Sequence, residues 1–293
     1  MKTLTVITTT YNRAQCIHQV YESLCRQNCR DFKWLVIDDG STDETERLIK
    51  RWIKDGIIDI EYYYKQNGGM HTARNVAYEL VNTELNVMID SDDWMTDNGV
   101  QLIIDYWNKN RSEDLYGIIA YNISTEGKII GSAFPDSIEK CTLLQLEDNY
   151  HVKGDKKIVL RSDLSKLYPY PEYPGEKFYP PSYKFKMLDQ TYRLGILRDP
   201  VGVVDYNEDS MTYRKFNQYK TCCNGFAHFR NEMMRVTKSK ITNIRLCIHY
   251  ITESMLAKKK GYISSCSRPW LAVCCFPAGV LFFYYLMHTR KNY

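Results

Sequence analysis

The sequence predicts an α/β fold, with a mostly parallel sheet flanked by helices and a C-terminal helical extension. Three observations lead to this prediction. Short apolar segments rich in β-branched residues alternate with segments of helical periodicity over the first 125 residues. Polar loops follow four of those short segments. Beyond residue 205 the signals become helical only, and the charge changes from acidic to basic.

The expected strands are short, apolar and bounded by polar or glycine-containing turns. Five segments fit this description: 4–9, 32–37, 59–65, 86–89 and 116–121. Strands that alternate with helices along a chain pair mostly in parallel, so helices should cover both faces of the sheet.

The intervening segments carry apolar residues at the three- and four-residue spacing of one helix face. They predict helices over 17–24, 41–53, 72–81 and 100–107. Ser41 and Glu44 have the spacing of a capping box, which predicts that the second helix begins there. From 125 to 205 the pattern breaks up, and the prolines between 169 and 181 indicate a long loop with a function.

Four polar loops follow the first four expected strands. They comprise residues 9–12, 38–41, 66–71 and 90–93. In an open parallel sheet, ligands bind beyond the carboxyl ends of the strands. The sequence therefore predicts that these loops meet at one edge of the sheet and form a binding site there.

The most informative of these loops contains three carboxylates, Asp90, Asp92 and Asp93, at the end of a buried strand. Carboxylates this close repel each other unless a cation lies between them. Oxygen ligands suit Mn²⁺ or Mg²⁺, which usually bind together with a substrate phosphate. The alternative is a solvated acidic turn that caps the next helix.

The other loops contain polar groups with two interpretations each. Asp38 and Asp39 can accept hydrogen bonds from a base or a ribose, because the predicted Ser41 cap leaves them free. Asn67 and Gly68 allow close approach of the backbone to a ligand, or simply form a tight turn. Arg74 reaches a phosphate or forms an ordinary surface ion pair.

Taken in order, the motifs resemble those of family 2 glycosyltransferases of the GT-A fold, over roughly residues 3–205. The matching segments are Thr9-Thr10-Tyr11-Asn12-Arg13, Asp38-Asp39-Gly40-Ser41-Thr42-Asp43, Asn67-Gly68-Gly69-x-His71-x-Ala73-Arg74-Asn75 and Asp90-Ser91-Asp92-Asp93. Each motif alone is weak, whereas four in this order are specific. The resemblance implies an inverting transfer of a sugar from a nucleotide diphosphate sugar, most often linked to UDP, with Mn²⁺ or Mg²⁺.

The resemblance also assigns functions to individual residues. Thr9 and Asp39 are expected to contact the base, and Asp90 to lie near the ribose. Asp92 is expected to bind the metal, with Asp93 as the competing ligand. The remaining donor-binding candidates are Tyr11, Asp38, Asn67, Gly68 and Arg74.

An inverting transfer needs a carboxylate that deprotonates the acceptor hydroxyl from the face opposite the leaving group. In the family this base lies in a later loop, often as Glu-Asp. Glu176 is the candidate here, although Lys177 replaces the Asp, and Asp189 is the alternative. Processive members carry Gln-x-x-Arg-Trp, whereas residues 190–194 read Gln-Thr-Tyr-Arg-Leu, so a non-processive hexosyltransferase is expected.

The extension at 206–293 contains 14 Lys/Arg and 4 Asp/Glu, whereas residues 1–205 contain 25 and 31. The apolar segment 270–287 carries no charge and is interrupted by Pro277 and Gly279. A basic, apolar tail favours a membrane surface over nucleic acid as partner. We expect a cytoplasmic protein that associates peripherally with the inner face of the cell membrane; the alternative is a buried terminal helix.

The sequence thus predicts a glycosyltransferase domain at 1–205 and a membrane-associating extension at 206–293. It should add one sugar to a growing cell-surface glycan, with a lipid-linked acceptor. Two alternatives remain. A metal-dependent nucleotidyl- or phosphoryl-transfer enzyme would ordinarily need a glycine-rich phosphate loop, which is absent after the first strand. A non-catalytic scaffold that kept the fold would have no reason to retain three clustered carboxylates.

Overall fold

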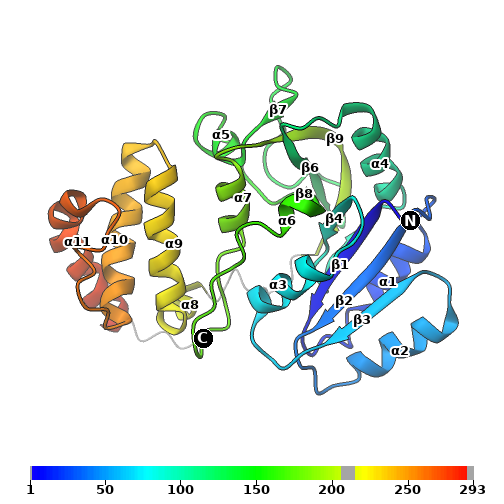
Figure 1. The fold of residues 1–293 in the computed structure, drawn as a ribbon, viewed down its shortest axis with the longest axis horizontal. Helices are drawn as coiled ribbons and strands as arrows, with labels where there is room; N and C mark the ends of the chain where they lie inside the picture. Colours follow the sequence, from blue (N-terminus) through cyan, green and yellow to red (C-terminus); the bar gives the residue numbers. More distant parts are fainter. Residues whose placement is uncertain (1, 206–214, 289–293) are drawn as a thin grey trace. The chain divides into compact units, whose positions relative to one another are not determined.

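The computed structural model describes residues 2–205 and 215–288 (Figure 1). The chain divides into two compact units. The first unit comprises Met1–Pro169 and Leu188–Asn207, and the second comprises Tyr170–Met187 and Glu208–Tyr293. Residues 170–187 thus group with the C-terminal helices, whereas the sequence analysis placed one boundary at residue 205.

The first unit is built on one mixed sheet, in the order β3-β2-β1-β4-β8-β6-β9-β5 with β7 paired to β9. Strands β1, β2, β3, β4, β6 and β9 point in one direction, and β5, β7 and β8 run antiparallel to their neighbours. The prediction of a mostly parallel sheet is confirmed. The strands are β1 Leu4–Thr10, β2 Phe32–Asp38, β3 Ile60–Tyr64, β4 Leu85–Met88, β5 Trp94–Met95, β6 Leu115–Ser124, β7 Lys140–Cys141, β8 Lys156–Arg161 and β9 Arg193–Val204.

Helices cover both faces of this sheet. On one face, α1, α2 and α4 join a core that contains the stacked rings of Tyr21 and Trp52, 4.3 Å apart, and the fully buried Trp34. On the other face α3 packs against β1 and β2, and its small residues Ala73 and Ala77 are fully buried. The helices of the first unit are α1 His18–Cys25, α2 Thr45–Asp55, α3 Met70–Leu80, α4 Gly99–Asn110, α5 Leu143–Asp148 and α6 Ser162–Ser165. Helix α7, Ser182–Leu188, belongs to the second unit except for its last residue.

The predicted capping box is wrong. Helix α2 begins at Thr45, and Glu44 at its N-cap makes no side-chain capping bond. Instead, the Thr45 backbone N–H donates to the Asp43 carboxylate at 3.1 Å. The Ser41 hydroxyl accepts from the backbone N–H of Asn12 at 2.8 Å, so it connects two loops and does not begin a helix.

The second unit is helical beyond residue 214. It contains α8 Lys215–Thr221, α9 Cys223–Val236, α10 Lys240–Leu256 and α11 Pro269–His288. Helix α10 packs against both α9 and α11 (Figure 1). Among the described residues, α11 is the single helix that is long and apolar enough to cross a membrane.

Candidate active site

The four polar loops meet at the carboxyl ends of β1, β2, β3 and β4, as predicted. The parallel register makes this necessary, because Thr10, the last residue of β1, pairs with Asp38, the last residue of β2. Asp38 in turn pairs with Tyr64 at the end of β3, and Ile7 of β1 pairs with Met88 at the end of β4. Thr9, half-buried, and Tyr11, 48% exposed, extend this edge from β1.

The loops after β1 and β2 are held together by side-chain to backbone hydrogen bonds. Asn12 adopts the left-handed conformation, with φ of 53°. Its side-chain oxygen accepts from the Thr42 backbone N–H at 2.7 Å. Asp38, fully buried, accepts from the Ser41 backbone N–H at 2.7 Å and from the Tyr62 hydroxyl at 2.8 Å. Asp38 is therefore not free, contrary to the prediction that a Ser41 helix cap leaves it available to a ligand.

Asp39 connects the loops after β2 and β3. One carboxylate oxygen accepts from the Lys65 ammonium at 2.6 Å and from the Gly68 backbone N–H at 2.9 Å. The other accepts from the Gly69 backbone N–H at 2.7 Å, and the Asn67 amide donates to the Asp39 carbonyl at 2.8 Å. Since Asp39 is only 3% exposed, these contacts give it a structural function; its contact with a base stays a prediction.

Gly68 lies in this loop close to two polar side chains, which a larger residue would displace. A Cβ atom at position 68 would lie 2.5 Å from the Thr72 hydroxyl and 2.9 Å from the Lys65 ammonium. Both of these groups belong to the protein itself, so close approach of this backbone to a ligand stays a prediction. Gly69, with φ of 98°, then precedes the first residue of α3.

Arg74 on α3 reaches the loop after β4. Its guanidinium donates to the Asp90 carboxylate at 3.1 Å. The Arg74 side chain is 10% exposed and that of Asp90 is 52% exposed. The pair thus presents an accessible carboxylate that is held in place by a buried cation.

Asp92 and Asp93 differ in their surroundings. The Asp92 side chain is 31% exposed and lies 3.8 Å from the Arg13 guanidinium. The Asp93 side chain is 10% exposed and lies 3.8 Å from the ammonium of Lys157 on β8. Burial raises the pKa of Asp93 to about 7, although Lys157 acts in the opposite direction. Asp92 is therefore the more accessible of the two adjacent carboxylates.

Two carboxylates of this loop are accessible, so they can supply oxygen ligands to a divalent cation. Within residues 2–205 and 215–288, no three His, Cys, Asp or Glu side chains are arranged to hold a metal. Mg²⁺ and Mn²⁺ commonly bind through one or two carboxylates and complete their coordination with substrate phosphates and water. Asp92 and Asp90 offer accessible oxygens of this kind.

The two candidate bases are both buried and hydrogen-bonded within their own units. Glu176 accepts from the backbone N–H groups of Asn224 and Gly225, both at 2.8 Å, at the beginning of α9. Asp189 accepts from the Tyr116 hydroxyl at 2.9 Å and from two backbone N–H groups at the beginning of α5. These contacts are those of helix caps. Deprotonation of an acceptor by either residue stays a prediction.

A substitution at Glu176 distinguishes the two functions. We expect Glu176→Gln to lower the free energy of unfolding by about 1–2 kcal/mol, because one charge-assisted acceptor is lost at the beginning of α9. Thermal unfolding by circular dichroism measures this, and initial rates below the melting temperature measure transfer. Glu172→Gln, at an exposed position nearby, is the control. Unchanged stability with abolished transfer would identify Glu176 as the base and refute a purely structural function.

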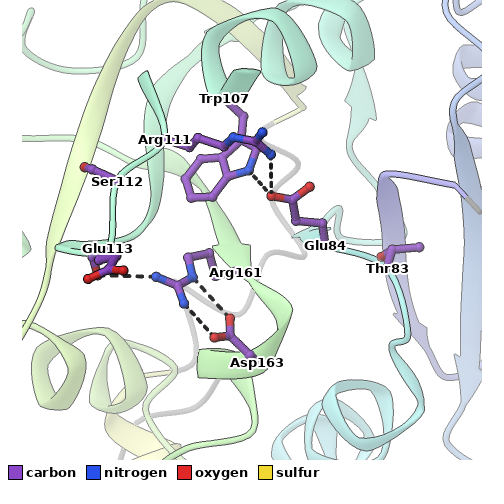
Figure 2. Close-up of a pocket in the computed structure, with 8 residues that line it drawn as sticks. All are labelled: Thr83, Glu84, Trp107, Arg111, Ser112, Glu113, Arg161 and Asp163. Carbon is purple, nitrogen blue, oxygen red and sulfur yellow. Dashed lines mark hydrogen bonds and ion pairs between the residues drawn. The ribbon is translucent and has the colours of Figure 1, made fainter. Parts of the chain in front are cut away.

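A separate cavity of about 480 Å³ lies at the opposite edge of the sheet, where β4 and β6 begin (Figure 2). Four of its five charged side chains form two ion pairs, Glu84 with Arg111 and Arg161 with Asp163. The Glu84 carboxylate accepts from the indole of Trp107 at 2.7 Å and lies 3.4 Å from the guanidinium of Arg111. Arg161 binds Asp163 through two nitrogen atoms (Figure 2). Because it lies where β4 and β6 begin, this cavity is distinct from the loops at the carboxyl ends of the strands.

Three basic residues of the site were not assigned by sequence reasoning. Arg13 belongs to the first of the four motifs, and Lys65 follows β3 directly at the predicted edge, so the sequence position of each residue is a signal for the site. Lys157 gave no such signal, because its strand lies in the segment where periodicity breaks up.

The family model described as Glycosyl transferase family 2 matches residues 5–167, more than half of the chain. The matched segment contains all four loops and both arginines at the site.

Two curated proteins illustrate the similarity. A teichoic acid poly(glycerol phosphate) polymerase from Staphylococcus epidermidis is 33% identical over 109 residues, which cover 37% of this chain and 15% of that protein. The poly(ribitol-phosphate) beta-N-acetylglucosaminyltransferase TarP from Staphylococcus aureus is 26% identical over 137 residues, 45% of this chain and 41% of that protein. The matches therefore span less than half the length of either relative.

Two solved structures show the same fold. S. aureus TarS 1–349 in complex with UDP-GlcNAc aligns with a TM-score of 0.60 and 16% identity, covering 96% of this chain and 81% of that one. The mannosyltransferase PcManGT from Pyrobaculum calidifontis, in complex with GDP-Man and Mn²⁺, aligns with a TM-score of 0.55 and 15% identity, covering 99% and 76%. The predicted GT-A fold is confirmed.

Proposed function

Because this chain belongs to glycosyl transferase family 2, we propose that it transfers one sugar from a UDP-sugar to a hydroxyl of a cell-surface glycan. The observation that carries the proposal is the juxtaposition of the Asp39 loop, the Arg74–Asp90 pair and the accessible Asp92 at one sheet edge. Acidic, amide and cationic groups arranged in this way match the ribose, base and diphosphate of such a donor.

The proposed reaction forms a bond between the acceptor oxygen and the anomeric carbon. The bond from that carbon to the diphosphate oxygen breaks, the nucleoside diphosphate leaves, and the acceptor proton passes to a carboxylate base. Glu176 is the proposed base, with Asp189 as the alternative. Arg13 and Arg74 offset negative charge around the leaving diphosphate, since both guanidinium groups lie beside the acidic loop.

Asp92, assisted by Asp90, would hold Mn²⁺ or Mg²⁺, and Asp93 is the competing ligand. A bound ion of this kind supplies Lewis-acid stabilisation of the diphosphate. Exposure supports this assignment, because the Asp92 side chain is three times as exposed as that of Asp93, 31% against 10%.

The acceptor that we propose is a teichoic-acid-like glycan linked to lipid, at the cytoplasmic face of the membrane. The names of two relatives, a teichoic acid polymerase and a poly(ribitol-phosphate) glycosyltransferase, support this class of acceptor. We further propose that the enzyme is a non-processive hexosyltransferase, because residues 190–194 lack the tryptophan of the processive motif.

Thermal unfolding of the full chain with a panel of nucleotide sugars tests the proposal. We expect one UDP-sugar to raise the melting temperature with Mn²⁺ present, and EDTA to abolish the shift. At a donor concentration about 100 times Kd, the gain in unfolding free energy is about 2.7 kcal/mol. The matching nucleoside monophosphate is the control, because it lacks the diphosphate. If no nucleotide sugar stabilises the protein in any metal, it is a scaffold that kept the fold.

A further inference from the structure

Helix α11 carries a large apolar surface that the described residues of the second unit leave exposed. Trp270 is 86% exposed, Leu281 is 72% exposed, and Val273, Tyr284 and Met287 are each 55% exposed. Soluble proteins seldom expose contiguous apolar patches of this extent unless the patch meets a partner or a membrane.

The opposite face of α11 packs closely on α10. Its buried residues, Ala272, Cys275, Gly279 and Leu286, recur at spacings of three, four and seven, the pattern of one helix seam. The Thr252 hydroxyl donates to the Gly279 carbonyl at 2.9 Å. A Cβ at Gly279 would lie 2.7 Å from the Cβ of Ile251, so the two backbones approach as closely as glycine permits. This seam holds α11 on α10.

The seam argues against a membrane-spanning α11. The beginnings of α10 and α11 lie together, because Lys240 and Ile244 line one groove with Arg268 and Trp270. A spanning α11 that kept the seam would carry α10 into the hydrocarbon, including the exposed Arg245. Buried charges are expensive there, whereas a helix that lies in the interface keeps charged residues at headgroup level.

Charge identifies the occupant of this surface. Residues 236–293 contain nine Lys/Arg and one acidic residue, Glu253, which is 1% exposed and lies 3.6 Å from Arg230. Lys240 and Arg268 line the groove of about 490 Å³ beside Trp270, and Lys258–Lys260 are exposed after α10. An anionic lipid surface complements these cations, whereas a second copy of the chain would place like charges together.

We propose that α10 and α11 form an in-plane docking surface for an anionic bilayer, with α11 remaining packed on α10. The surface consists of Ile244, Trp270, Val273 and Leu281, with Lys240 and Arg268 at headgroup level. The inference rests on the proposed function, because a lipid-linked acceptor would lie in the same bilayer that this surface binds.

Flotation of the full chain with vesicles tests the docking. We expect binding to vesicles that contain phosphatidylglycerol, little binding to pure phosphatidylcholine, and weakening by salt. Trp270→Ser combined with Leu281→Ser should weaken binding about tenfold or more, because both side chains enter the interface. Ile57→Ser, a similarly exposed position in the first unit, is the control. An unchanged fraction of the double variant on vesicles would overturn the proposal.

Fluorescence quenching by brominated lipids tests the in-plane geometry. Trp270 and a Leu281→Trp variant lie eleven residues apart, about 16 Å along a helix. In-plane docking predicts that lipids brominated near the headgroup quench both best. If deep bromines quench the residue at 281 best, α11 spans the membrane and the geometry is wrong.

Two further measurements separate the remaining outcomes. A dimer in light scattering without lipid, combined with no flotation, would assign the surface to a second copy and overturn the proposal. The melting-temperature shift with a UDP-sugar, measured without vesicles, reports donor binding independently. If that shift persists while flotation fails, the docking proposal fails and the proposed function stands.

Discussion

Asp92→Ala is expected to lower kcat/KM for sugar transfer by roughly 10²–10³-fold while the protein stays folded. The Asp92 side chain is 31% exposed, and its ion pair with Arg13, at 3.8 Å, is long. An exposed pair of this kind contributes about 0–1 kcal/mol to stability. Loss of the carboxylate should therefore affect the binding of Mn²⁺ and the donor far more than folding.

Initial rates across a Mn²⁺ titration measure this effect. The apparent Kd for Mn²⁺ should rise in Asp92→Ala, whereas the melting temperature without ligand should change little. Asp97→Ala is the matched control, because Asp97 is also an exposed carboxylate paired with an arginine, Arg26. Transfer by Asp92→Ala at the normal Mn²⁺ dependence would exclude Asp92 as the ligand. Loss of metal dependence in Asp93→Asn instead would then favour the competing ligand.

The first half of the fold could be predicted because each of its elements has a local signal. The strands 4–9 and 32–37 are buried on both faces, so nearly every residue is apolar or β-branched, and the structure places β1 and β2 there. The loops between these elements could be assigned to one edge for the same reason, since parallel strands bring their carboxyl ends together.

The second half gave weaker signals for physical reasons. Strand β8 begins with Lys156 and Lys157, and the latter is buried because its ammonium faces Asp93 across the sheet edge. Strand β9 contains Arg198 and Pro200, and its pairing with β6 has register shifts near residue 200. Charged residues and a proline break the apolar alternation by which a strand is recognised in a sequence. Strands β8 and β9 are instead stabilised by long-range contacts, which the local pattern does not show.

Loop positions could be predicted, but hydrogen-bond partners could not. Asp39 and Glu176 were selected as carboxylates in functional loops, and the structure shows both accepting backbone N–H groups from distant segments. The N–H groups that these carboxylates accept from lie 30 residues away for Asp39 and 49 residues away for Glu176. Sequence motifs of helix capping span only a few residues, so neither pair could be recognised from the sequence. For the same reason, sequence reasoning expected Asp38 to be free when Ser41 and Tyr62 bind it.

Asp39→Asn is expected to destabilise the protein by about 3 kcal/mol and to abolish the donor-dependent shift in melting temperature. The side chains of Asp39 and Lys65 are 5% and 17% exposed, so the substitution leaves a mostly buried ammonium without its carboxylate. It also removes an acceptor from the Gly68–Gly69 backbone. Because α3 begins there and carries Arg74, the pair with Asp90 should lose its alignment.

A double-mutant cycle with Lys65→Met measures the pair, and denaturant unfolding gives each free energy. If the two side chains act as a unit, the double variant should be less destabilised than the sum of the single variants by about 1–3 kcal/mol. Glu126→Gln, in the exposed pair with Lys128, is the control and should change stability by less than about 0.5 kcal/mol. Lost donor binding at unchanged stability would mean that Asp39 contacts the base directly, as the family resemblance implies. If the variant loses both stability and donor binding, Asp39 acts by holding the loop on which the donor rests.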